Sequence, residues 1–230
     1  MKIRFSKVFY VIILLPFLVV TWLLLTSANA NNLPDLKNGD LVFQTIKSSQ
    51  TAAIMVASSS PYTHVGIVKI DESGNPLVVE AIGPVREIGL DEWIKQGVAG
   101  RITIKRMKSL TEESALKVLD AAKEYYGRPY DFYFYFDKES IYCSELVYYA
   151  FKDAMSIELG KIQDIKSLNF DNSVVKDIIE QRWKNYPLCK GRVDKFEKCY
   201  DIILDQKLVT PASVAEDKRF ATIYSNYTPF

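Results

Sequence analysis

The sequence predicts an α+β domain in which a small antiparallel β-sheet or barrel packs against a helix that begins at Cys143. Two short apolar runs at residues 63–70 and 77–82 flank a polar turn, a pattern typical of an antiparallel hairpin. A third run at residues 101–107 has the composition of another strand of the same sheet. Helical periodicity follows at residues 143–154, where apolar side chains recur on one face.

Cys143 is expected in the first turn of this helix, because residues 136–140 have the composition of a loop. Apolar residues follow at +3, +4, +7 and +8 from Cys143, which is one face of a 3.6-residue repeat. The unpaired N–H groups and the positive end of the helix dipole favour a thiolate at this position. A thiolate is a nucleophile or a metal ligand. The alternative is that Cys143 is a small buried hydrophobic residue.

Residues 1–30 have the pattern of a secretory signal peptide and are expected to lie outside the fold. Three basic residues precede an uncharged apolar run at residues 8–25, and an A-x-A cleavage site ends at Ala30. The apolar run is also close to the minimum for a membrane span, so an uncleaved anchor in the inner membrane is the alternative. Both interpretations place residues 31–230 outside the cytoplasm, in the periplasm or the extracellular space.

Charge and length favour one nearly neutral domain over residues 31–230. The leader carries three basic and no acidic residues, so without it the formal net charge falls from +1 to −2. Such a domain has no electrostatic reason to bind nucleic acid or an anionic membrane face. About 200 residues are enough for one sizeable core. No linker, repeat or low-complexity tract divides them.

The first half of the domain has short elements around the hairpin. A turn at residues 37–40 leads into a strand at residues 41–44, and a short helix is expected around residues 52–57. Residues 90–96 have the pattern of a helical turn that precedes the third strand.

Helices dominate the second half. Residues 109–112 (SLTE) have a capping-box pattern and start a helix that runs to Tyr126, where a Gly and a Pro end it. Another helix is expected around residues 173–183, and a Thr-Pro pair at residues 210–211 starts a last short helix.

Residues 130–136 (YDFYFYF) form an aromatic stretch that leads toward Cys143. Core packing is the commoner use of such side chains, and the alternative is that they line a substrate groove.

The chain contains three cysteines, Cys143, Cys189 and Cys199. In an oxidising compartment an even number of them should pair. Cys189 and Cys199 are ten residues apart in a polar stretch and can close a small loop. Cys143 is then the free thiol, kept for chemistry. The alternative is that all three are reduced.

The single histidine, His64, stands at the start of a predicted strand. A cysteine hydrolase needs a base that takes the thiol proton and then protonates the leaving group, and a histidine does both near neutral pH. Cys143 must therefore pair with His64 if the chain has this chemistry. The alternative is a structural histidine.

Glu80 lies inside the apolar run 77–82, where an ionised side chain is costly unless it is paired. If the hairpin turns near residues 72–75, Glu80 lies directly or diagonally across from His64, within side-chain reach. His64 and Glu80 point to the same face of the sheet whenever the numbers of paired residues in the hairpin add up to an even number. A carboxylate there could orient the imidazole and fix its tautomer, as the third member of a triad. The alternative is an edge-strand Glu that faces water.

Other chemistries have little support in the sequence. One His and scattered Cys cannot build a His-rich or Cys-rich zinc site. The chain has no Gly-rich phosphate loop, no Walker A pattern and no G-x-S-x-G elbow. We therefore expect no cofactor and no metal.

Five motifs, in this order and spacing, resemble the permuted papain-like (NlpC-type) cysteine hydrolases of the YiiX/YaeF branch. The motifs are residues 39–43 (GDLVF), 63–68 (THVGIV), 79–81 (VEA), 127–132 (GRPYDF) and 142–147 (YCSELV). In that family the histidine precedes the cysteine, the reverse of the ordinary papain order.

The resemblance covers residues 38–155 and the Thr-Pro pair. It implies a papain-like fold, with Cys143 as the nucleophile, His64 as the base and Glu80 as the third polar residue. It also implies hydrolysis of amide bonds, often in cell-wall peptides. Residues 156–209 have no counterpart that we recognise in the family, and this insertion could reshape the groove.

The sequence therefore predicts a secreted or periplasmic cysteine hydrolase that acts on a peptide or acyl-amide substrate. The backbone N–H of Cys143 is expected to help hold the oxyanion, and Tyr130 or Tyr142 could add a side-chain donor. Two alternatives remain. A lipid-directed acyltransferase or thioesterase would use the same triad, whereas a non-catalytic binding module would not need all three residues.

Overall fold

The computed structural model describes residues 33–136 and 138–227. The signal peptide or membrane anchor expected over residues 1–30 lies outside this part of the chain. Within the described ranges, no helix is both long enough and apolar enough to cross a membrane.

A six-stranded antiparallel sheet forms the centre of the fold, with the strand order β4-β3-β2-β1-β5-β8. Its strands are β1 (Leu41–Gln44), β2 (His64–Ile70), β3 (Pro76–Glu80), β4 (Arg86–Gly89), β5 (Thr103–Met107) and β8 (Phe220–Ser225). The four strands predicted from the sequence are confirmed. The sequence did not predict β4 or β8. β4 is half charged, and β8 pairs with a strand far away along the chain, so neither has a strong local signal.

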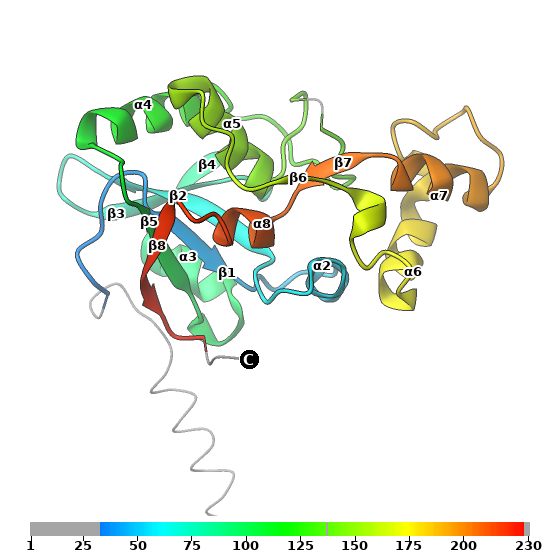
Figure 1. Ribbon diagram of the computed structural model, residues 1–230, viewed down its shortest axis with the longest axis horizontal. Coiled ribbons are helices and arrows are strands. Elements are labelled where there is room, and N and C mark those ends of the chain that lie inside the picture. The colour runs from blue at the N-terminus through cyan, green and yellow to red at the C-terminus, as the bar shows by residue number, and fades with distance from the viewer. Residues whose placement is uncertain (1–32, 137, 228–230) are drawn as a thin grey trace, which may run out of the picture.

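Helices cover both faces of the sheet (Figure 1). They are α2 (Thr51–Ser58), α3 (Leu90–Gln96), α4 (Glu112–Lys123), α5 (Cys143–Met155), α6 (Ser173–Arg182), α7 (Phe196–Leu204) and α8 (Pro211–Ala215). One apolar core lies between the sheet and the pair α4 and α5, and a second core lies between the other face and α3. Alternation of side chains along the strands separates the two cores: Phe43 and Ile67 enter the first, whereas Val42 and Val68 enter the second.

Helix α5 begins at Cys143, as the sequence predicts, and its first nine residues are buried. Tyr142 precedes it in an extended conformation, and the Tyr142 N–H donates to the carboxylate of Glu145 at 3.4 Å. Ser156 ends the helix in the left-handed region, with φ at 58°. Cys143 is therefore the first helical residue, where backbone N–H groups have no partner within the helix.

The other predicted helices are present, with one correction. The capping box of α4 is formed by Thr111 and Ser114, not by the SLTE pattern of residues 109–112: the Thr111 side chain accepts from the Ser114 N–H at 3.2 Å. The short Ser114 side chain returns a bond to the Thr111 N–H at 2.9 Å. Helix α7 was not predicted, because its first residues continue a polar stretch.

Residues 156–209 form a lobe that lies beside α2 and away from the centre of the sheet (Figure 1). It contains α6, α7 and a small two-stranded sheet of β6 (Ile162–Asp164) and β7 (Lys207–Val209). A disulfide joins Cys189 to Cys199, whose Cα atoms are 5.6 Å apart. Cys143 is a free, buried cysteine.

Gly66 allows close packing of β2 on β3. A Cβ atom at this position would lie 2.3 Å from Val78 Cγ1 and 3.1 Å from the Val79 carbonyl oxygen. We therefore expect Gly66→Ala to lower the free energy of unfolding by about 1–3 kcal/mol, measured by urea denaturation. Gly83→Ala is the control, because a Cβ there meets no atom within 4 Å. Equal stability of the two variants would contradict this account of the hairpin.

Candidate active site

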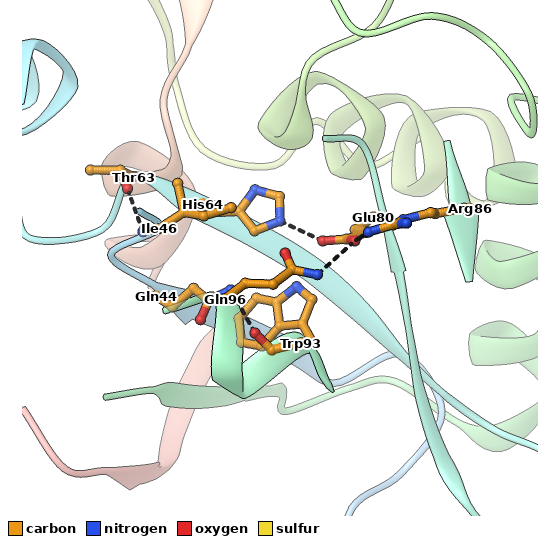
Figure 2. A network of polar contacts seen from close by, with 8 residues as sticks. All are labelled: Gln44, Ile46, Thr63, His64, Glu80, Arg86, Trp93 and Gln96. Carbon is orange, nitrogen blue, oxygen red and sulfur yellow. Dashed lines mark hydrogen bonds and ion pairs between the residues drawn. The ribbon is translucent and has the colours of Figure 1, made fainter. Parts of the chain in front are cut away.

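The hairpin brings His64 and Glu80 together. β2 and β3 pair with Ile67 opposite Val79 and Val68 opposite Val78, which places Glu80 diagonally across from His64 on the same face. The predicted shared face is thus confirmed. His64 Nε2 lies 2.8 Å from Glu80 Oε2, and the two side chains are 3% and 0% exposed (Figure 2).

The second oxygen of Glu80 binds two residues that the sequence analysis missed. Arg86, opposite Glu80 in β4, donates to Oε1 from Nε at 3.2 Å and from Nη2 at 3.1 Å. Gln96 Nε2, at the end of α3, lies 3.5 Å from the same oxygen. The one local signal for this ion pair was that Glu80 and Arg86, of opposite charge, stand on either side of the short turn after β3. Nothing in the sequence indicated Gln96.

These contacts keep Glu80 ionised despite its burial. Burial alone raises the pKa of the carboxyl group, but hydrogen bonds and charge from His64, and then from Arg86, outweigh it and lower the pKa. The carboxylate can therefore fix the tautomer and the orientation of the imidazole.

The indole of Trp93 stacks on one face of the His64 imidazole. The ring centroids of His64 and Trp93 are 5.8 Å apart at an interplanar angle of 26°. Trp93 is fully buried in α3, and its carbonyl oxygen accepts from Gln44 Nε2 at 3.1 Å. Glu80 contacts the edge of the imidazole and Trp93 contacts its face, so the two residues restrict rotation of the ring. A base that accepts a proton and returns it needs such a fixed orientation.

The imidazole also forms a hydrogen bond with Cys143. Since Nε2 faces Glu80, Nδ1 is the ring nitrogen left for the thiol. Burial lowers the pKa of His64, but the hydrogen bonds to Cys143 and Glu80, and the charges of both, raise it to about 9. The imidazolium therefore persists through neutral pH beside Cys143, at the start of α5.

The two candidate tyrosines have different surroundings. Tyr130 is linked to Ile141 by an isolated bridge, and burial, followed by the negative charge of Cys143, raises the pKa of its hydroxyl. In contrast, the Tyr142 hydroxyl accepts from the Val209 N–H at 3.1 Å and its side chain is almost fully buried. Tyr142 thus connects α5 to β7, a structural use that the oxyanion prediction did not anticipate.

The aromatic stretch serves both of its predicted uses. Phe134 and Phe136 pack against Tyr142 with ring centroids 5.3 and 6.4 Å apart. Phe134 also lines an apolar cavity of about 60 Å³ that reaches Cys143. Cys143 is therefore adjacent to an apolar space.

Similarity to known proteins agrees with this geometry. The model of the permuted papain-like amidases, the YaeF/YiiX or C92 family, matches residues 35–224. This chain belongs to that family. As a C92 protein it is a cysteine hydrolase of the amidase and peptidase type, with a permuted papain-like α+β fold.

Two Escherichia coli proteins show the same relationship. The uncharacterized protein YiiX of strain K12 is 30% identical over 196 residues, which are 84% of this chain and 89% of YiiX. A crystal structure described as metalloprotein yiiX from strain O157:H7 superposes with a TM-score of 0.73 at 30% identity, and the match covers 84% of this chain and 98% of that one.

That description calls the Escherichia coli protein a metalloprotein. Within residues 33–136 and 138–227, no group of three or more His, Cys, Asp and Glu side chains is arranged to hold a metal ion. The described residues of this C92 chain therefore do not fit a metal site.

His64 is the only histidine, so its imidazole signals can be followed in an NMR titration without further assignment. We expect a midpoint at about pH 9. Cys143→Ala and Glu80→Gln should each lower the midpoint, because each removes a hydrogen bond and a negative charge that favour the imidazolium. Glu113→Gln, at an exposed site on α4, is the control and should not change it. A wild-type midpoint near the ordinary value of 6.5 would contradict the arrangement.

Proposed function

We propose that the chain hydrolyses amide bonds with Cys143 as the nucleophile, His64 as the base and acid, and Glu80 as the residue that orients His64. One observation carries the proposal: buried His64 interacts with Cys143 on one side and with Glu80 on the other. His64 Nε2 lies 2.8 Å from the Glu80 carboxylate. Arg86 is a positioning residue that acts through Glu80.

In the first half of the reaction, Cys143 Sγ⁻ attacks the carbonyl carbon of the substrate and forms a tetrahedral oxyanion. As the C–N bond breaks, the His64 imidazolium gives its Nδ1 proton to the leaving nitrogen. The amine departs, and the acyl group remains on sulfur as a thioester.

In the second half, neutral His64 takes a proton from water while the water oxygen attacks the thioester carbon. Collapse of this second intermediate breaks the C–S bond, releases the carboxylic acid and restores the thiolate–imidazolium pair. The backbone N–H of Cys143 and the Tyr130 hydroxyl are the oxyanion donors that we assign. The N–H of Cys143 lies at the start of α5, where the helix dipole also favours negative charge.

Acyl amides are the substrate class that we favour over cell-wall peptides. The cavity that reaches Cys143 has an apolar lining, which suits an apolar acyl group better than a polar cell-wall peptide. The same cavity favours a second candidate, a lipid-directed acyltransferase or thioesterase. Intact-mass profiling with acyl amides, acyl thioesters and cell-wall peptides, each tested by itself, separates these classes, because only an accepted donor leaves its acyl group on Cys143.

Kinetics of the three variants test the triad. We expect Cys143→Ala and His64→Ala to lower kcat more than about 1,000-fold, and Glu80→Gln to lower it by a smaller factor, roughly 10- to 1,000-fold. The Gln side chain keeps the shape and one acceptor but loses the charge that stabilises the imidazolium. The double variant Cys143→Ala/Glu80→Gln should be no worse than Cys143→Ala alone. Full activity of Glu80→Gln, with only a lower Tm, would make Glu80 a structural carboxylate.

The pH dependence follows from the raised pKa of His64. The leaving amine needs the imidazolium proton, so kcat/KM should fall as the pH rises through about 9. In Glu80→Gln this decline should begin at lower pH, because the charge that raises the pKa is gone. A decline at the same pH in both proteins would remove Glu80 from the catalytic unit.

We also propose that the protein works in the periplasm or outside the cell. The Cys189–Cys199 disulfide supports this, because such bonds persist in oxidising compartments. Non-reducing peptide mapping of protein from an exported fraction should find this pair and a free Cys143. A bond from Cys143 to either partner would contradict both the assignment of the disulfide and the catalytic role.

A further inference from the structure

The cavity at Cys143 adjoins a second one. The first, which we call the proximal cavity, has a volume of about 60 Å³ and is bounded by the start of α5, α2 and β7. The second, the distal cavity, has a volume of about 100 Å³ and lies between α2, the aromatic stretch and the lobe of residues 156–209. The two share five lining residues: Ile54, Ala57, Phe134, Phe170 and Leu208.

The walls of both cavities are almost entirely apolar, but two residues that line the distal one each carry a buried, unpaired polar atom. Arg182 Nη1, at the end of α6, and the hydroxyl of Tyr186 are buried and have no hydrogen-bond partner among the described residues. Tyr186 is 3% exposed. Neither residue lines the proximal cavity, and Cys143 does not line the distal one. Cys143 and the two residues with unpaired donors therefore line different but adjoining cavities.

A buried donor without a partner costs free energy, and a guanidinium costs more than a neutral group. Such groups in a ligand site are explained when the ligand supplies the acceptor. The apolar wall between them and Cys143 requires that the rest of the ligand be hydrocarbon.

We propose that the acyl group of the substrate fills both cavities: its carbonyl lies at Cys143, its chain is apolar, and its far end carries an anionic acceptor, such as a carboxylate, that binds Arg182 and Tyr186. This inference rests on the proposed function and names its substrate class. The lobe of residues 156–209 then selects the acyl group, since it supplies Arg182, Tyr186 and much of the distal wall.

The volumes limit the length of the chain. A cavity of about 150 Å³ in another protein stays dry and binds benzene, a six-carbon molecule. The proximal and distal cavities, about 60 and 100 Å³, are together of similar size and so fit a chain of six to eight carbons.

Three fluorogenic amides of 7-amino-4-methylcoumarin test the proposal with the full-length protein: the acetyl amide, the octanoyl amide and the half-amide of octanedioic acid. We expect kcat/KM to be about 100-fold higher for octanoyl than for acetyl, because the methylenes leave water. The half-amide should gain roughly another tenfold from its bond to Arg182. Equal rates for acetyl and octanoyl would overturn the acyl site.

Two pairs of variants separate the parts of the site. Ala57→Phe fills the junction of the cavities and should remove most of the preference for octanoyl over acetyl. Ala52→Phe, at an exposed position of α2, should keep it. Arg182→Met should remove only the preference for the half-amide over octanoyl, whereas Arg192→Met, at an exposed position, should keep both preferences. An unchanged half-amide preference in Arg182→Met would overturn the acceptor end.

Calorimetric binding to the Cys143→Ala protein provides a readout without turnover. Octanedioate should bind roughly tenfold more tightly than octanoate, and Arg182→Met in this background should abolish the difference. If wild type and Cys143→Ala cleave the amides equally, the proposed function fails, while binding still reports on the cavity. If turnover depends on Cys143 but neither acid binds, the cavity proposal fails by itself.

Discussion

The buried pair of His64 and Glu80 is the interaction on which the rest of the site depends. Placing two ionisable side chains in the interior costs several kcal/mol of desolvation for each, and their attraction offsets this only when the remaining hydrogen-bonding groups are satisfied. Arg86 and Gln96 satisfy the free oxygen of Glu80, and Cys143 engages the other side of His64. Removing any one partner leaves a buried charge, so sheet, α3 and α5 must all be in place together.

The fold brings these groups together at one end of the sheet, where the layer of α3 and the layer of α5 meet. His64 and Glu80 belong to the face that packs on α3, whereas α5 packs on the opposite face. Cys143 reaches His64 because it is the first residue of α5 and His64 is the first residue of β2. The close approach of β2 to β3 at Gly66 sets the diagonal that brings Glu80 within 2.8 Å.

In the proposed function, catalysis and selection of substrate come from different parts of the chain. The sheet and α5 hold the groups assigned to bond making and breaking, and the lobe of residues 156–209 forms much of the wall of the distal cavity. The disulfide lies in this lobe. This division explains how one catalytic geometry can serve other acyl groups: a change in the lobe alters the cavity and leaves the hairpin register unchanged.

The sequence by itself determined the hairpin, the start of α5 and which residues are candidates for the catalytic groups. These follow from local patterns: alternation in the strands, an apolar face after Cys143, a single histidine, and a charged residue within an apolar run. Arg86, Gln96 and Trp93 could not be assigned in the same way, because their role depends on how β4 and α3 pack beside Glu80 and His64. The neighbouring positions of the proximal and distal cavities were also decided only by tertiary structure, since their shared walls come from segments that are distant along the chain and meet only when the core forms.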